Sequence, residues 1–324
     1  MEPHILAVDI GGTNTIIGVV NQQGNVKNRL SILTNGQEGR TSLLDRLIRA
    51  IQKTIYLSTD LHIVGIGVGM AGPTDLSTGV MHNPPHLPGW NNFSLKESLE
   101  NHFSLSVFVG NDATLSALAE YKFGAGAGKS YKDLVYITVS TGIGGGLVIN
   151  GIPHFGSRGY SGEIGHMAIV PRGPRCDCGG NGCLESVASG TAIARNARDI
   201  LSSGVKDSIM RQDVGGYLNR ITSLVVANAA RQKDQVAVEI IEKAARYLGI
   251  GLANIIVALD PDIIVIGGGV SNSLDLMMPS LTRELDKRST KWLGSRTQVI
   301  KSYLGDDAAV IGAACFASSS LYSK

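Results

Sequence analysis

Short apolar runs alternate along this chain with longer stretches in which apolar residues recur every three or four positions. The apolar runs 5–10, 63–70, 135–140 and 263–270 have the length and composition of buried strands. Residues 43–55 have the periodicity of an amphipathic helix. Because strand and helix patterns alternate, the sequence predicts an α/β protein.

The sequence also marks the ends of several elements. A strand is expected to end at Val109, with a turn at Gly110 and a helix that begins at Asn111 or Asp112. A second, long helical pattern stops at Asp260, before a proline. The helix that begins at Asn111 or Asp112 therefore starts directly after a buried strand.

Residues 5–24 and 134–153 follow the same plan. Each segment has an apolar strand, a turn rich in glycine and threonine, a second apolar strand and an Asn/Gly hairpin turn. Such a repeat predicts two similar α/β halves that face one another. Two turns of this kind can grip one polyphosphate from opposite sides.

A chain of 324 residues is about twice the usual length of a domain. We expect a small N-terminal domain of residues 1–112 and about 308–324, and a large C-terminal domain of residues 113–307. The hinge is expected near the helix starts at 112 and 308, and the final helix is expected to return to the N-terminal half. Residues 201–235 have weak periodicity and carry no prediction.

The composition narrows the possible partners. The formal net charge is +2, with 29 basic and 27 acidic residues, and this balance does not indicate an electrostatic surface for nucleic acid or membranes. The N-terminus has no basic segment followed by an apolar core, and no apolar run approaches the roughly 20 residues that span a bilayer. We expect a cytoplasmic protein that holds any anionic ligand locally.

Three of the four cysteines lie within eight residues, at Cys176, Cys178 and Cys183. In a reducing compartment, clustered thiols are more often metal ligands or redox groups than disulfides. His166 is available as a fourth ligand, and three thiolates with one imidazole form a closed, structural zinc site. The alternative is a set of free thiols on a loop, while Cys315 is expected in the core.

Two carboxylates flank this predicted metal site. Glu163 precedes His166 by three positions, and Glu185 follows Cys183 by two. We expect the metal to hold both segments together, so that His166 binds it through one nitrogen and offers the other to a ligand. Metal removal is then expected to weaken ligand binding here before it disturbs a nucleotide site. The alternative is that both glutamates are surface or supporting carboxylates.

The glycine-rich motifs differ in how strongly they indicate a nucleotide-binding or phosphate-binding site. Residues 67–72 match a dinucleotide fingerprint and residues 123–130 approach a P-loop, but neither has the strand and helix that such a site requires. In residues 9–14, two glycines allow backbone N–H groups to converge on an anion, Thr13 adds a hydroxyl, and Asp9 can approach Mg²⁺ directly or through water. A hairpin without a ligand is the alternative.

Asp112 also has two interpretations. Asn and Asp are preferred helix N-caps whatever a protein does. A carboxylate at a strand-to-helix turn can also accept a proton from a hydroxyl during phosphoryl transfer. Motif context has to decide between the two.

Together these motifs resemble the ROK family (repressors, open reading frames and sugar kinases), and within it the bacterial ATP-dependent glucokinases, over nearly the whole chain. The resemblance rests on residues 9–18, 110–113, 140–146, 162–166, 176–185, 266–270 and 306–314. It implies an actin-like ATPase (ribonuclease-H-like) fold, in which two α/β domains close on ATP in a central cleft. It also implies transfer of the ATP γ-phosphoryl to the 6-hydroxyl of a hexose, with Mg²⁺ and a structural Zn²⁺.

The resemblance assigns roles by motif, with Asp112 as the catalytic base. The residues implied in sugar binding are Gly72, Asn91, Asn111, Asp112, Glu163, His166 and Glu185. Those implied for phosphate and Mg²⁺ are Asp9, Gly11, Gly12, Thr13, Thr141 and Gly142, and those for adenosine are Gly268 and Gly269. The implied zinc ligands are His166, Cys176, Cys178 and Cys183.

Several alternatives stay open at this point. The sugar can be glucose or another hexose or N-acetyl amino sugar (mannose, fructose, N-acetylglucosamine, N-acetylmannosamine). A sugar-sensing regulator without enzymatic activity, or a nucleotide switch that acts on protein partners, would be a different class. Eight residues precede Asp9, so we expect no helix-turn-helix domain and no nucleic-acid partner. A homodimer or higher homo-oligomer is expected from the family resemblance.

Overall fold

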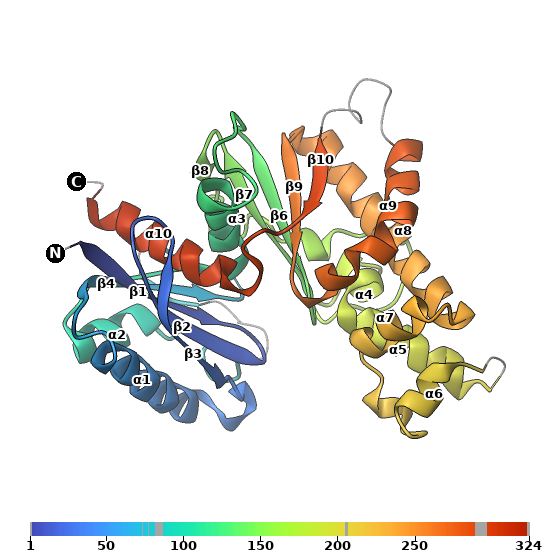
Figure 1. Cartoon of the computed structure of the whole chain (residues 1–324), viewed down its shortest axis with the longest axis horizontal. Coiled ribbons are helices and arrows are strands. Elements are labelled where there is room, and N and C mark those ends of the chain that lie inside the picture. Colours follow the sequence, from blue (N-terminus) through green and yellow to red (C-terminus); the bar gives the residue numbers. More distant parts are fainter. Residues whose placement is uncertain are drawn as a thin grey trace. The chain divides into compact units, whose positions relative to one another are not determined.

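The computed structural model describes residues 2–72, 74–76, 78–81, 87–204, 207–288 and 297–322. These residues form two five-stranded sheets, with the orders β3-β2-β1-β4-β5 and β10-β9-β6-β7-β8 (Figure 1). The strands of the first are β1 (Pro3–Ile10), β2 (Asn14–Val20), β3 (Val26–Leu33), β4 (His62–Met70) and β5 (Val107–Asn111). Those of the second are β6 (Leu134–Val139), β7 (Ile143–Ile149), β8 (Ile152–Pro153), β9 (Ile263–Gly267) and β10 (Gln298–Lys301). The strands predicted from apolar runs are all present.

The described residues separate into two compact units. The first lies within Met1–Tyr136, Gly146–Gly162 and Tyr303–Lys324, and the second within Ile137–Gly145 and Glu163–Ser302. The predicted domains, whose ranges include residues outside the described part such as 289–296 and 323–324, divide the chain at 112 and 307 instead. In the structure α3 (Asp112–Phe123) belongs to the first unit, because it packs along α10 (Ala308–Tyr322). The hinge predicted at the starts of these two helices stays a prediction.

Helices cover both faces of the first unit's sheet. Successive side chains of a strand point to opposite faces. Leu6 and Val8 of β1 thus join a buried cluster with α1 (Arg40–Tyr56) and α2 (Leu95–Phe103), whereas Ala7 faces α10 (Figure 1). The prediction that the final helix returns to the N-terminal half is confirmed.

The predicted repeat is also present. The β1 strand pairs antiparallel with β2 through the turn at residues 11–13, and β6 and β7 are neighbours joined by residues 140–142. Asn150 and Gly151 both have positive φ and connect β7 to β8, as a two-residue hairpin requires. Each repeat therefore places one short glycine turn between two strands.

One boundary predicted from the sequence is wrong. The strand expected to end at Val109 continues through Gly110 to Asn111, and α3 begins at the next residue. Gly110 pairs with Gly69 of the parallel strand β4, so it is part of the ladder instead of a turn. The chain passes from strand to helix at Asp112 without a connecting loop.

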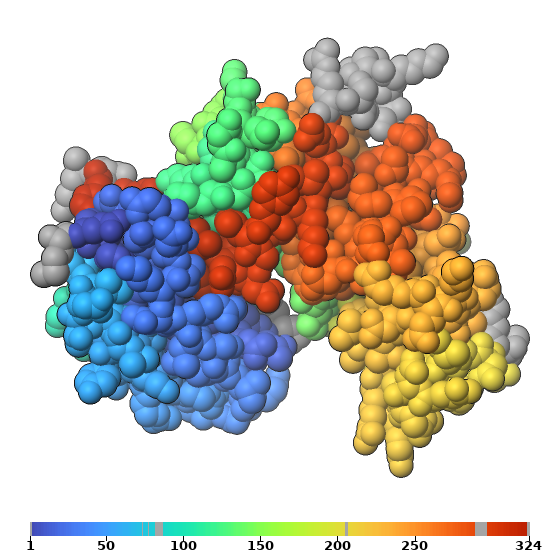
Figure 2. All heavy atoms as spheres, viewed as in Figure 1, coloured from blue at the N-terminus to red at the C-terminus, as the bar shows by residue number. Residues whose placement is uncertain are grey.

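The second unit is mainly helical. Its helices are α4 (Leu184–Ala188), α5 (Gly190–Ser202), α6 (Ile209–Asp213), α7 (Ser223–Arg231), α8 (Gln235–Leu259) and α9 (Leu274–Arg288). As predicted, α8 ends before Asp260, which has a positive φ. The described residues of the uninterpreted region 201–235 include α6 and α7, which lie in the yellow and gold part of the surface in Figure 2. Within the described ranges, each helix is too short or too polar to cross a membrane.

Short 3₁₀ turns complete the chain. They are η1 (Gly36–Glu38), η2 (Ile164–His166), η3 (Leu218–Arg220), η4 (Gly269–Ser273) and η5 (Gly305–Asp307). Of these, η2 carries His166 and η1 precedes α1 by one residue. The turn η2 therefore lies within residues 162–166, a motif that the sequence marks as functional.

Candidate functional site

The first glycine turn, residues 11–13, exposes a backbone donor. The Gly11 N–H donates to Asn14 O over 3.1 Å and closes the turn. Gly12 and Thr13 are exposed, and among the described residues the Gly12 N–H donates to no acceptor. A free N–H beside a threonine hydroxyl is a set of donors that suits a phosphate oxygen.

Asp9 lies at the carboxyl end of β1, and the surroundings of one of its carboxylate oxygens are unusual for a buried polar atom. Its Oδ1 atom is buried and has no hydrogen-bond partner within the described ranges. Burial, and then the nearby carboxylate of Asp112, raises the pKa of Asp9 well above its ordinary value. A buried carboxylate oxygen without a donor is suited to a cation or to a water molecule that a cation holds.

Asp9 and Asp112 approach one another across β4. Gly69 pairs with Asp9 on one side and with Gly110 on the other. A methyl group on Gly69 would lie 3.6 Å from both Asp9 Oδ1 and Asp112 Cα. The structure thus brings these two predicted residues together, with no side chain of β4 between them.

Asn111, not Asp112, caps α3. The Asn111 side chain accepts the Thr114 N–H over 3.0 Å, and its amide donates to Gly72 O over 3.4 Å. The Asp112 Oδ1 atom accepts the N–H of the next residue, Ala113, over 2.8 Å. Because Asn111 already fulfils the capping role, capping does not explain an aspartate at 112.

Gly72 and Asn91 are the remaining predicted sugar residues of the first unit. Gly72 is joined to Asn111 by the hydrogen bond above and has a positive φ of 103°. Asn91 lies in an exposed turn after the buried Trp90. Its part in a sugar site stays a prediction.

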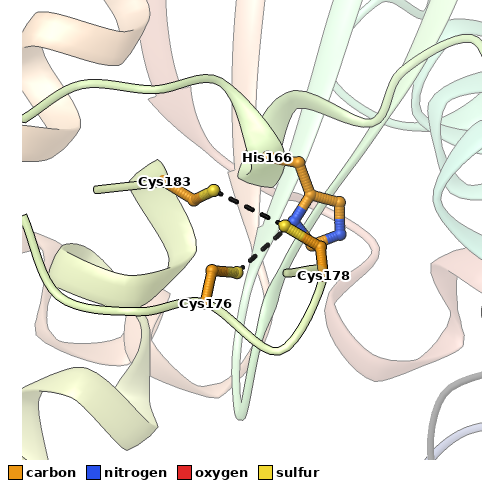
Figure 3. Close-up of side chains that lie close together, drawn as sticks. All are labelled: His166, Cys176, Cys178 and Cys183. Atoms are coloured by element: carbon orange, nitrogen blue, oxygen red, sulfur yellow. Dashed lines mark hydrogen bonds between the residues drawn. The ribbon is translucent and has the colours of Figure 1, made fainter. Parts of the chain in front are cut away.

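The four predicted metal ligands of the second unit converge. One ligand atom from each of His166, Cys176, Cys178 and Cys183 lies within 4.8 Å of all the others (Figure 3). The Cys178 and Cys183 sulfurs are 3.7 Å apart, and the Cys176 sulfur is 3.7 Å from His166 Nδ1. A tetrahedral zinc ion requires separations of about 3.8 Å between sulfurs and about 3.6 Å between sulfur and nitrogen. The donor set therefore fits zinc in kind and in spacing.

The thiols differ in their environments. The backbone N–H of Gly180 lowers the pKa of the exposed Cys178. Burial raises the pKa of Cys176, and it raises that of Cys183 to about 12. Without a positive ion the buried pair holds its protons, and a bound metal would replace them.

His166 presents its two nitrogens to different groups. While Nδ1 faces the cysteines, Nε2 lies 3.7 Å from Glu163 Oε2. Burial raises the pKa of Glu163, His166 opposes this, and the carboxylate of Glu185 adds to it. One nitrogen of His166 thus faces the predicted metal ligands and the other lies near a carboxylate. That this second nitrogen is offered to a bound ligand stays a prediction.

Glu185 supports the second glycine turn. Its Oε2 atom accepts the Ile143 N–H over 2.8 Å, and its Oε1 atom lies 3.9 Å from the Cys176 sulfur. A Cβ atom on Gly142 would come within van der Waals radii of the same carboxylate, so Gly142 leaves room for Glu185. The sequence predicted Glu185 as a sugar contact and did not anticipate this bond.

The segment after Glu185 holds the same turn from the other side. The N–H groups of Gly190 and Thr191, at the start of α5, donate to Ser140 O over 2.8 Å and to Thr141 O over 3.4 Å. The side chain of Thr141 remains exposed. The cysteine loop and the second turn are thus connected within one unit.

Gly268 and Gly269 follow β9, where adenosine binding is predicted. Gly268 has a φ of 80°, and a Cβ atom there would lie 2.6 Å from Val139 O, so the position requires glycine. At Gly269 a Cβ atom would meet nothing within 4 Å. The backbone is open at Gly269, as a flat ligand requires, and its role stays a prediction.

Sequence reasoning missed three supporting features. Gly69 lies in the motif 67–72, which was set aside because no dinucleotide helix follows; Pro73 lies outside the described residues. Thr34, after β3, contacts the first turn, and the start of α5 holds the second turn. Of these three features, only Gly69 could have been recognised from the sequence, because glycine in a buried strand often marks a close approach of another part of the backbone or a ligand.

Comparisons with known proteins agree with these features. The ROK family profile matches residues 5–320. The glucokinase of Halalkalibacterium halodurans is 35% identical over 310 residues, which are 95% of this chain and 92% of that protein. The DNA-binding transcriptional dual regulator NagC of Escherichia coli is 33% identical over 269 residues, 82% of this chain and 64% of NagC.

Solved structures give the same result. A ROK family glucokinase from Streptomyces griseus, in complex with glucose and AMPPNP, superposes with a TM-score of 0.85 at 32% identity, covering 97% of this chain and 99% of that one. The predicted actin-like ATPase fold is confirmed. Since the family profile covers nearly the entire sequence and close relatives match along most of their length, the chain belongs to the ROK family.

Proposed function

We propose that this protein is a hexose kinase that transfers the γ-phosphoryl group of ATP to the 6-hydroxyl of glucose. The observation that carries the proposal is the pair of carboxylates, Asp9 and Asp112, beside a glycine turn with a free N–H. Phosphoryl transfer needs one group to take a proton and others to hold charged phosphates. Glucokinases are among the relatives that match most of the chain.

Asp112 is the general base in this proposal. One of its oxygens accepts the 6-hydroxyl proton as the hydroxyl oxygen bonds to the γ-phosphorus and the bond to ADP breaks. The products are ADP and the sugar 6-phosphate, with the proton on Asp112. The cap provided by Asn111 supports this role, because Asp112 is not needed to begin the helix.

The two glycine turns bind the nucleotide phosphates. In the first unit Gly12 and Thr13 offer backbone and hydroxyl donors while Gly11 closes the turn, and in the second Thr141 and Gly142 offer donors. Asp9 would hold Mg²⁺, directly or through water, and its unpartnered buried oxygen fits that role. When bound, Mg²⁺ neutralises charge on the phosphates. Gly268 and Gly269 line the adenosine.

Sugar hydroxyls are bound by Asn111 and Gly72 of the first unit and by Glu163, His166 and Glu185 of the second, with Asn91 as a further contact. Zinc on His166, Cys176, Cys178 and Cys183 would hold together the two segments that carry Glu163 and Glu185. It has no chemical step in this proposal, because four protein ligands leave no open position. The fit of their spacing to a tetrahedron supports zinc.

A panel of sugars in a coupled ADP-release assay tests the proposal. We expect ADP release with glucose and ATP, and much less with mannose, fructose, N-acetylglucosamine or N-acetylmannosamine. Faster turnover of another sugar would replace glucose in the proposal and keep the chemistry. The product's phosphate position is then read by ³¹P NMR.

A sugar-sensing regulator is the second candidate, favoured by the 33% identity to NagC. It would bind a sugar without releasing ADP. Isothermal titration with each sugar, run beside the ADP assay, separates the two functions. Binding without turnover for every sugar in the panel would support the regulator and reject the kinase.

A further inference from the structure

Thr34 contacts the first glycine turn at two points. Its hydroxyl donates to Gly11 O over 2.7 Å, and its N–H donates to Thr13 O over 2.8 Å. Thr34 is fully buried and follows the last residue of β3. The turn is therefore held from the protein side through two carbonyl groups.

The hydroxyl of Thr34 has one hydrogen, and Gly11 O receives it. The 3.0 Å contact between the Thr34 and Thr15 hydroxyls must then run from Thr15 to Thr34. Thr15 is also fully buried. These bonds fix the rotamer of Thr34 and leave its hydroxyl no second donor position.

The geometry of the peptide bond makes this contact relevant to a ligand. In a trans peptide, the C=O of one residue and the N–H of the next point in opposite directions, and the described chain has no cis peptide. Because Thr34 holds Gly11 C=O inward, the Gly12 N–H is directed outward. This is the exposed N–H that donates to no acceptor in the described part of the chain.

Arg46 of α1 extends the support. Its Nη2 donates to Thr34 O over 2.6 Å, and its Nη1 pairs with Glu38 Oε2 at 2.7 Å. Glu38 in turn accepts from the Ser42 hydroxyl, and Arg46 and Ser42 hold the pKa of Glu38 below its usual value. The turn is thus connected through Thr34 to the first helix of its unit.

We propose that Thr34 is a positioning residue for nucleotide binding, which fixes the Gly12 N–H toward a phosphate oxygen, with Arg46 as its support. The inference rests on the proposed function, because it takes the ligand of this turn to be the phosphates of ATP. Thr34 touches no substrate itself. Its effect is expected on nucleotide affinity and not on sugar affinity.

The test compares two substitutions at this position. Thr34→Val keeps the shape and removes the hydroxyl, so the dissociation constant for AMPPNP with Mg²⁺, measured by calorimetry, is expected to rise about tenfold. Thr34→Ser keeps the hydroxyl and should stay within about threefold of the wild type. The dissociation constant of the sugar chosen by the panel should change by less than about twofold in both.

A second buried threonine provides the matched control. The Thr54 hydroxyl donates to Ala50 O, one turn earlier in α1, and Thr54 lies in the same unit as Thr34. Thr54→Val therefore removes a buried hydroxyl without touching the turn. If Thr34→Val binds AMPPNP as tightly as Thr54→Val does, the inference is overturned.

Two further outcomes of this experiment each have a definite interpretation. If Thr34→Val does not fold, the inference rests on Arg46→Gln, which should weaken AMPPNP binding about threefold; unchanged affinity in that folded variant would reject it. If the wild type itself binds no AMPPNP, the proposed function fails and the inference fails with it. If the wild type binds AMPPNP and Thr34→Val binds it more weakly while Thr54→Val does not, the result supports both the proposed function and the inference.

Discussion

The two glycine turns of the repeat look alike in sequence but are supported in different ways. The turn at residues 11–13 is held through its carbonyl groups by a neutral, buried threonine. The turn at residues 140–142 is held by a carboxylate, Glu185, together with the start of α5. Glu185 follows the last cysteine of the cluster by two residues. A repeated strand-turn-strand unit therefore does not imply a repeated support, and within the described residues it is the second turn that is connected to the predicted metal ligands.

The largest effect is expected from Asp112, the proposed general base. Asp112→Asn removes the base and should lower kcat about 10²- to 10⁴-fold. AMPPNP and sugar affinities should stay near those of the wild type, because both turns are intact. The ADP assay gives kcat and calorimetry gives the affinities.

Asp45→Asn, an exposed aspartate on α1, is the matched control and should keep full activity. Near-normal turnover of Asp112→Asn would remove Asp112 from the catalytic role. It would leave the comparison of the two turns untouched.

Metal removal is expected to loosen the second glycine turn and to leave the first unchanged. The sequence predicted a loss of sugar binding before any effect on the nucleotide site. The bond from Glu185 to Ile143 changes this expectation, since a loosened cysteine loop also releases the second turn. We expect Cys176→Ser, or chelation, to weaken sugar and AMPPNP binding together, each about tenfold or more.

Hydrogen exchange read by mass spectrometry checks where the change occurs. Peptides that cover residues 140–143 should exchange faster after chelation, and peptides that cover residues 11–13 should not. Cys315→Ser, in the first unit and outside the cluster, controls for loss of a buried thiol and should retain the metal. A protected second turn in the metal-free protein would contradict the connection.

A smaller effect is expected from Gly142→Ala. The added methyl group would overlap the Glu185 carboxylate, and such overpacking typically costs about 1–3 kcal/mol. Urea denaturation gives the free energy of unfolding. Gly269→Ala, in the same unit, meets no atom within 4 Å and should cost much less. Equal losses of unfolding free energy in the two variants would show that the Glu185 side chain moves away from the added methyl group without destabilising the fold.

Local chemistry was predictable from the sequence where it depended on neighbouring residues. The periodic helix of residues 43–55, the hairpin at Asn150 and the convergence of the four predicted metal ligands follow from spacing and residue type, and the structure contains each of them. The strand boundary at Val109 was wrong, because glycine suggested a turn where β4 provides a ladder partner. Propensity is a weak guide where tertiary pairing decides.

The supports of the turns were not predictable in the same way. Thr34 lies 21 residues or more from the backbone atoms that it holds, and Glu185 lies 42 residues from Ile143. A threonine after a strand has no sequence mark that distinguishes a support from a surface residue. Such bonds depend on how strands are placed beside one another, which residue patterns specify only through the complete fold.

The clustering of the second unit's functional residues has a consequence for protein engineering. The cysteine loop, both glutamates, His166 and the groups that hold the second turn all lie within residues 163–191. A single exchange of this segment between relatives would transfer the proposed metal ligands, the proposed sugar-binding carboxylates and the turn support together. Outside this segment, the exchange also requires glycine at position 142. In a recipient with alanine there, the cysteines and His166 would still fit, but the Glu185 carboxylate would be displaced.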